Sequence, residues 1–214
     1  MLNWLQELHS AQGIAQLVGA GGLYVLFGII FAETGLLFGF FLPGDSLLIT
    51  AGVLSNPVNP NFIPGLNIYT MNVALIIAAT LGNQTGYFLG NRMGERIWKR
   101  PDGRFYKRKH LEAAQTFYKT YGGFAVIAAR YIPIFRTFVP FAAGMARMPY
   151  RQFVFWDITG GVLWITSLLW LGYFLGRTEL ANRLDKIIVI VIFVSVLPMI
   201  IGGGRKIFKQ LKAV

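Results

Sequence analysis

Apolar residues form five long runs along the chain, and charged or proline-rich segments separate them. The runs cover 21–54, 72–94, 122–148, 152–176 and 187–204. An α-helix needs about 20 apolar residues to cross a bilayer, whereas core strands have about 5 or 6 residues. The pattern therefore predicts an all-α, polytopic membrane protein. Spaced apolar positions in residues 2–18 also indicate an interfacial helix over 1–20.

Two of the runs, 21–54 and 122–148, are interrupted by helix-breaking residues. The breaks are Pro43, Gly44, Pro133 and Pro140. Proline inside a helix removes a hydrogen bond and clashes with the preceding turn. We expect each broken run to fold as a re-entrant helical hairpin that returns to the side from which it entered.

A hairpin followed by one transmembrane helix makes a single net crossing, so two such units would lie inverted in the membrane. The sequence GYFLG at 86–90 recurs at 172–176, and FLP at 41–43 is echoed by FVP at 138–140. Within a single membrane domain over 1–214 we expect an interfacial helix (1–20), repeat unit one (21–94), a cytoplasmic basic connection (95–121), inverted repeat unit two (122–177) and a last transmembrane helix (186–204).

Glycines recur at four-residue spacing in the second run. They are Gly82, Gly86, Gly90 and Gly94. Small residues at this spacing allow helices to approach closely. The ladder favours a tight seam against a hairpin of the same chain, and a homodimer interface is also possible.

The formal net charge of the 214 residues is +11. Between Arg92 and Lys109, eight basic residues stand against two acidic ones, a net charge of +6. The positive-inside rule places this segment and the basic C-terminal tail in the cytoplasm, and the N-terminus outside. Because the charges lie mostly between runs, they indicate contacts with anionic lipid rather than with nucleic acid.

Apart from Arg147 at the end of the second run, four charged residues lie inside the two broken runs. They are Glu33, Asp45, Arg130 and Arg136. Each ionised group near the bilayer centre costs about 2.5–3.5 kcal/mol on insertion scales, and this set is neutral when all four are ionised. Glu33 and Asp45 would lie about 18 Å apart on one straight helix, so the hairpin is needed to bring them together. We expect all four to meet in one site, although a purely structural salt-bridge cluster remains an alternative.

The starts of the returning half-helices offer a binding site for an anion. Asp45 or Ser46 could cap the half-helix after Pro43, and Pro140 could start a second one. Helix N-termini favour anions, and arginines bind phosphate bidentately. Protonating a neighbouring carboxylate would strengthen anion binding, which provides a basis for proton coupling. Further candidates for headgroup contacts are Tyr131 and Thr137.

Several polar and aromatic residues of the later spans have less specific interpretations. Asp157, a secondary site candidate, could cap the span 152–176 or pair with Arg147 or Arg151. Asn83 and Gln84 could line a transport path, but the preferred interpretation is neutral packing with hydrogen bonds between helices. The tryptophans of this span favour packing and interface anchoring; they are Trp156, Trp164 and Trp170.

The broken runs carry motifs that resemble the DedA family, whose homologues include the eukaryotic VTT-domain proteins. The motifs are ETGLL at 33–37, FLPGDSLL at 41–48, GG at 122–123, RYIPIFRTFVP at 130–140, AGM at 143–145, Tyr150-Arg151, the segment 157–164 and Gly172-Tyr173. The likeness covers roughly residues 20–200. It implies a bacterial inner-membrane protein with two opposed re-entrant hairpins, in which residues matching Glu33, Asp45, Arg130 and Arg136 are needed for function.

The resemblance also implies that the protein returns a polyprenyl-phosphate carrier lipid, chiefly undecaprenyl phosphate, from the outer to the inner leaflet. Flipping or scrambling of other phospholipids is an alternative, as is proton-coupled export of drugs or small cations. A scaffolding role is also open. An enzyme is disfavoured because His9 and His110 lie outside the apolar runs and no metal-ligand cluster is evident. The expected partners are the membrane, an anionic lipid and protons, with no cofactor and no metal.

Overall fold

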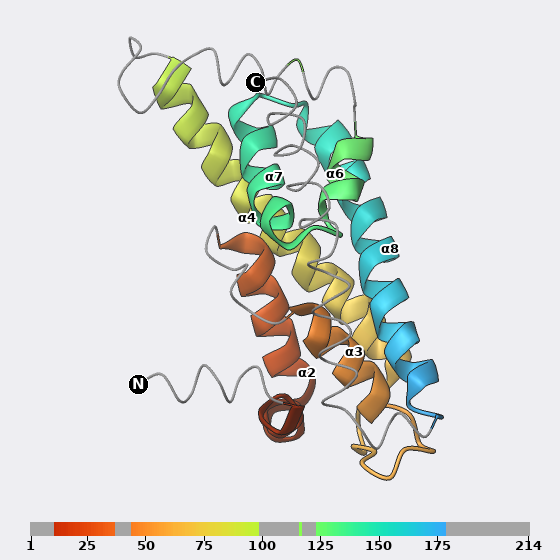
Figure 1. Ribbon diagram of the computed structural model, residues 1–214. Helices are drawn as coiled ribbons and strands as arrows, with labels where there is room; N and C mark the ends of the chain where they lie inside the picture. The colour runs from red at the N-terminus through yellow and green to blue at the C-terminus, as the bar shows by residue number, and fades with distance from the viewer. Residues whose placement is uncertain (1–10, 37–43, 99–115, 117–122, 179–214) are drawn as a thin grey trace, which may run out of the picture.

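The computed structural model describes residues 11–36, 44–98, 116 and 123–178, and the regular secondary structure of this part is helical, with loops and turns between the helices (Figure 1). The helices are α2 (Ala11–Gly35), α3 (Gly44–Leu54), α4 (Ile68–Trp98), α6 (Phe124–Ala129), α7 (Pro133–Met145) and α8 (Tyr150–Leu175). No strand occurs within these described ranges. The prediction of an all-α protein is confirmed.

Two of these helices are long and apolar enough to cross a membrane, namely α4 over Ile68–Glu95 and α8 over Tyr150–Leu175. The apolar helices Gly21–Gly35 and Gly44–Leu54 are shorter, and at 1.5 Å per residue neither reaches the roughly 30 Å of a hydrocarbon core. The predicted last helix (186–204) and most of the basic connection (95–121) lie outside the described residues.

Helix α2 contains a sharp change of direction at Gly22, whose φ of 52° is in the left-handed region that glycine adopts without strain. Figure 1 shows the first turns of α2 end-on, while the rest of the helix runs across the view. The prediction of an interfacial helix therefore corresponds in part to the segment before Gly22. Residues 1–10 of that prediction lie outside the described residues.

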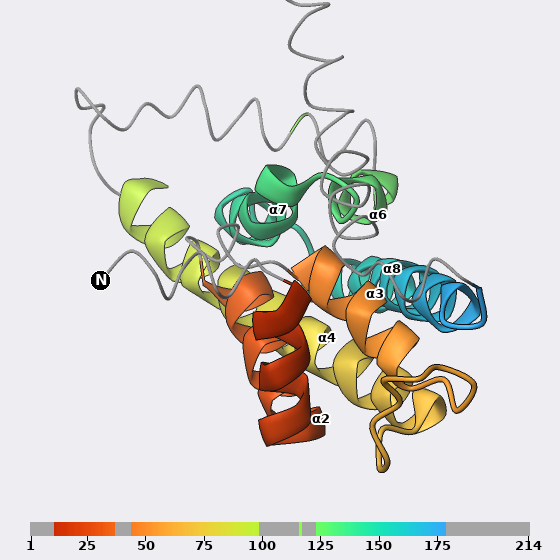
Figure 2. The same cartoon turned by 60° about the horizontal axis from the view of Figure 1, so that its bottom comes forward.

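The helices pair in a reciprocal pattern. Helix α2 packs on α4 and α6 packs on α8, so the first helix of each predicted unit contacts the long helix of its own unit. Helix α7 packs on α4 and α3 packs on α8, so the second helix of each unit contacts the long helix of the other. The long helices also contact each other, and Figure 2 shows α3 beside α8. The two units are thus interlocked.

Apolar side chains fill two larger clusters between the helices. One joins α2, α3, α4 and α8 and includes Leu26, Leu47, Leu75 and Trp164. The other joins α4, α6, α7 and α8 and includes Tyr87, Val126, Ala143 and Phe153. Most of the exposed large side chains on α4 and α8 are also apolar, as expected for helices that face lipid.

The glycine ladder of α4 forms the predicted seam. A Cβ added at Gly82 would meet Thr34 and Phe31 of α2, and one at Gly94 would lie 2.8 Å from the Cα of Met145 in α7. The second GYFLG behaves similarly, since a Cβ at Gly172 would meet the backbone of Ile49 in α3. The ladder therefore packs against helices of the same chain, as expected; the hairpin arrangement of these helices stays a prediction.

Gly90 and Gly86 offer a matched test of this seam. A Cβ at Gly90 would collide with the backbone carbonyl of Phe141, whereas one at Gly86 would lie 3.5 Å from Pro140 Cβ. We expect Gly90→Ala to lower the free energy of unfolding by about 1–3 kcal/mol and Gly86→Ala to leave it unchanged or slightly raised. Unfolding in mixed micelles measures the stability of both variants. Equal effects of the two substitutions would show that α4 and α7 are not in close contact at Gly90.

The structure corrects the predicted position of one break. Pro133 is the first residue of α7, where proline is well tolerated. Pro140 lies inside α7 rather than at a half-helix start, so the Arg136 carbonyl loses its usual intrahelical N–H donor. Pro43 lies outside the described residues, and Gly44 begins α3. The FVP segment thus lies inside a helix, and its equivalence to the FLP segment, which lies outside the described residues, stays a prediction.

Candidate functional site

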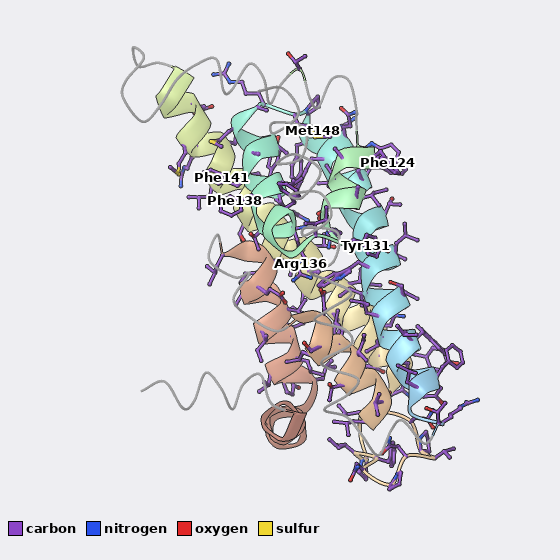
Figure 3. The ribbon with its side chains drawn as sticks, viewed as in Figure 1. Phe124, Tyr131, Arg136, Phe138, Phe141 and Met148 are labelled. Atoms are coloured by element: carbon purple, nitrogen blue, oxygen red, sulfur yellow. The ribbon has the colours of Figure 1, made fainter. Side chains whose placement is uncertain are left out.

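Arg136 binds the two predicted acidic residues. Its Nη1 donates to Asp45 Oδ1 at 2.6 Å, and its Nη2 donates to Glu33 Oε1. The three residues come from α7, α3 and α2, and Figure 3 shows Arg136 near the end of α7 that faces α2. The Arg136 and Glu33 side chains are almost completely buried, whereas that of Asp45 is 15% exposed. The three side chains thus meet as expected, whereas their roles in proton coupling and phosphate binding stay predictions.

Gly44 allows α3 to begin directly against Glu33. A Cβ at this position would lie 2.7 Å from Glu33 Oε1 and still closer to Oε2, so any larger residue would displace the carboxylate. The N-terminus of a helix also favours a negative charge. Asp45 and Ser46 both lie in the first turn of α3 rather than preceding it, so the prediction that either caps this helix is wrong. Asp45 is held by Arg136 instead.

Trp164 of α8 contacts both members of the Arg136–Asp45 pair. Its Nε1 donates to Asp45 Oδ1 at 3.0 Å, and Arg136 Cζ lies 4.6 Å from its ring centroid, a cation–π contact. Trp164 is 1% exposed. The interpretation of this tryptophan as packing or interface anchoring missed its role in the charged cluster.

Arg130 binds a different acid, Asp157. Its Nη2 donates to Asp157 Oδ1 at 2.6 Å and to the Asp157 backbone carbonyl at 2.9 Å. Asn83 of α4 donates from Nδ2 to the same Oδ1 at 2.7 Å. All three side chains are buried. Gly160 and Gly161 of α8 lie against the Arg130 side chain, so one face of α8 makes room for it.

The expectation that four charges meet at one point is therefore wrong for Arg130. Arg130 follows α6, whereas Arg136 lies within α7, and the break between these helices carries the two guanidinium groups to different partners. Asp157 lies seven residues after the start of α8. It pairs with Arg130, not with Arg147 or Arg151, and it does not cap the helix. The structure therefore contains two separate ion-pair clusters, Arg136 with two acids and Arg130 with one.

The remaining predicted contacts differ in their placement. Ser46 and Thr137 are buried next to Asp45 and Arg136 in the sequence. Tyr131 is 45% exposed on the turn after Arg130, so it does not join the buried cluster. Within the described residues, no group of three or more His, Cys, Asp or Glu side chains could hold a metal ion.

Both arginines have N–H groups without a hydrogen-bond acceptor among the described residues. Arg130 Nε and Nη1 and Arg136 Nε are buried and have no hydrogen-bond partner among the described residues. Leaving a buried charged donor unpaired is costly. These N–H groups are therefore available to an oxygen-rich anion, and Asp45 is the member of the Arg136 cluster that reaches solvent-accessible surface.

Comparison with known proteins gives a consistent result. Residues 42–174 match the model of the VTT domain. The chain is 39% identical to Protein DedA of Escherichia coli over 198 residues, covering 91% of this chain and 89% of that protein. It is 40% identical to an uncharacterized membrane protein of Mycobacterium tuberculosis (88% and 84% covered) and 31% identical to the inner membrane protein YghB of E. coli (82% and 77% covered). No solved structure matches.

Proposed function

The chain belongs to the DedA family of VTT-domain membrane proteins, and on this basis we propose that it moves a polyprenyl-phosphate carrier lipid, undecaprenyl phosphate, across the bacterial inner membrane in exchange with protons. The observation that carries the proposal is the buried cluster of Arg136 with Glu33 and Asp45. An anionic headgroup is the ligand that a guanidinium binds in place of a carboxylate.

The proposed architecture consists of two re-entrant hairpins in an inverted repeat. Its support is the reciprocal packing, in which each unit's second helix contacts the other unit's long helix, and the insufficient length of α3 for a crossing. The positive-inside rule gives the proposed orientation, with the basic segments after α4 and at the C-terminus in the cytoplasm. The N-terminus would lie outside.

Charge accounting supports proton coupling. With all groups ionised, Glu33, Asp45 and Arg136 have a net charge of −1, whereas Arg130 and Asp157 together are neutral. An anion that enters the Arg136 cluster would raise the local negative charge further. Uptake of a proton by Glu33 or Asp45 offsets this, so proton binding and anion binding favour each other.

Two alternative functions depend on which charges of the same cluster bind the cargo. The net charge of −1 favours a proton-coupled exporter of cations, whereas the two buried arginines disfavour a cationic cargo. Movement of other phospholipids uses the same headgroup chemistry. Neither alternative changes the lipid or drug covalently, and the proposed protein is a transporter without a cofactor rather than an enzyme.

The proposal is tested by lipid binding to the purified protein in weakly buffered detergent solution. We expect saturable binding of undecaprenyl phosphate with uptake of about one proton per lipid, and little binding of undecaprenol, which has the same chain and no phosphate. Mass spectrometry should recover the lipid unchanged. Equal binding of both lipids, or a dephosphorylated product, would contradict the proposal.

A further inference from the structure

We propose that Trp164 is a positioning residue that holds Asp45 when the anionic headgroup takes Arg136, an inference that rests on the proposed function. Trp164 lies on a third helix, α8, and contacts both Asp45 and Arg136. Its indole N–H donates to Asp45, and its aromatic face contacts Arg136. A tryptophan in a purely apolar packing role would need neither contact.

A headgroup that binds both terminal nitrogens of Arg136 in place of a carboxylate must displace one, because each of these nitrogens already donates to a carboxylate. Nη1 binds Asp45 and Nη2 binds Glu33. Glu33 is fully buried and lies against the first residue of α3, whereas the Asp45 side chain is 15% exposed. Asp45 is therefore the carboxylate that gives way to an incoming headgroup.

A displaced Asp45 is stabilised by a remaining donor, since its side chain is still largely enclosed by protein and a carboxylate that loses its donors there is disfavoured. Trp164 Nε1 already donates to Asp45 Oδ1, the same oxygen that Arg136 Nη1 binds. The indole N–H is uncharged and donor-only, so it can bond to Asp45 whether this residue is ionised or protonated. The bond thus remains available when Arg136 releases Asp45.

The ring of Trp164 has a separate effect on Arg136. The Arg136 Cζ lies over the Trp164 ring, and a guanidinium that contacts an aromatic face leaves its N–H groups for other acceptors. The phosphate would therefore meet an Arg136 whose N–H groups the ring does not occupy. Phenylalanine preserves such a face and removes the donor, whereas leucine removes both.

The test is the affinity of the purified protein for undecaprenyl phosphate. Phenylalanine cannot donate to Asp45, so in Trp164→Phe the displaced carboxylate would lack this hydrogen bond. We therefore expect Trp164→Phe to weaken binding about tenfold or more. Trp164→Leu, which also removes the aromatic face, should weaken it further. In an Asp45→Asn background, Trp164→Phe should have little effect, since an amide needs no charge-stabilising donor. Trp170→Phe on the same helix, where the ring contacts Tyr69 and Tyr173, is the matched control and should bind as wild type.

Outcomes for this inference and for the proposed function can be told apart. Normal affinity of Trp164→Phe beside a lipid-binding wild type would overturn the positioning role alone. A similar loss in the Asp45→Asn background would also overturn it, because the effect would then not act through Asp45. If the wild type binds no undecaprenyl phosphate, the proposed function and this role both fail. Thermal unfolding of Trp164→Phe, Asp45→Asn and the double variant would then still show whether the two side chains interact.

Discussion

Asp157→Leu is expected to lower the free energy of unfolding by about 3–5 kcal/mol, because it leaves the buried Arg130 guanidinium without its carboxylate. Arg130 is 1% exposed, and its Nε and Nη1 have no other partner among the described residues. The loss is measured by denaturant-induced unfolding of the purified protein in mixed micelles.

The double variant Arg130→Met, Asp157→Leu provides the control for this prediction. Replacing both members of a buried ion pair with apolar residues is often neutral or stabilising, so the double variant should recover most of the lost stability without recovering transport. A stable Asp157→Leu variant would contradict the pairing. A double variant with full transport would show that Arg130 serves folding alone.

Arg136→Met is expected to reduce transport to the level of protein-free vesicles. The substitution removes the cation shared by Glu33 and Asp45, so both carboxylates lose their counter-charge and the anionic headgroup loses its guanidinium ligand. Arg136→Lys should retain less than about a tenth of wild-type transport, because an ammonium is a point charge and does not match the planar fork of a guanidinium. Lipid transfer between leaflets measures both variants.

Arg151→Met is the matched control for Arg136→Met. Arg151 is an exposed arginine in the first turn of α8, so its removal changes the net charge equally without touching either cluster. It should transport at close to the wild-type rate. Similar losses in Arg136→Met and Arg151→Met would indicate that overall charge, rather than the buried cluster, controls transport.

The sequence was sufficient to predict one half of the site. Glu33 and Asp45 are too far apart to meet on one helix, and the Pro-Gly between them indicates a turn that brings them together. An arginine in the other broken run was the available counter-charge, and Arg136 fulfils that role. Charge in an apolar run is a strong signal because its cost restricts where it can go.

The contacts of Asp157 with Arg130 and of Trp164 with Arg136 were not predicted, because each residue also had an ordinary local interpretation. Asp157 lies early in its span, where acids commonly cap or pair locally, and Trp164 fits simple packing. Asn83 was expected to bond between helices, and its bond to Asp157 agrees with this. The spacing along α8 did contain a signal. Asp157, Gly160, Gly161 and Trp164 follow the i, i+3, i+4, i+7 pattern of one helix face, which combines a charge, two small residues and a donor facing the arginines.

The positions of the prolines show a second limit of the sequence. Both Pro133 and Pro140 lie in the run 122–148, and either could have started the second helix of this run. Pro133 does so because proline fits the first turn, where its missing N–H has no intrahelical partner to lose. Pro140 remains inside α7 at the point where this helix packs against Gly86 of α4. Tertiary packing therefore decides between two positions that appear equivalent locally.

The most direct test of the account is leaflet-resolved transfer of undecaprenyl phosphate in proteoliposomes, measured with and without a proton gradient. The wild type should transfer the lipid, and the gradient should change the rate. Glu33→Gln should abolish the gradient's effect, and Arg136→Met should abolish transfer. If folded wild-type protein gives no transfer above protein-free vesicles, undecaprenyl phosphate is not its cargo. If the gradient affects Glu33→Gln as it does the wild type, the Arg136 cluster does not couple protons to lipid movement.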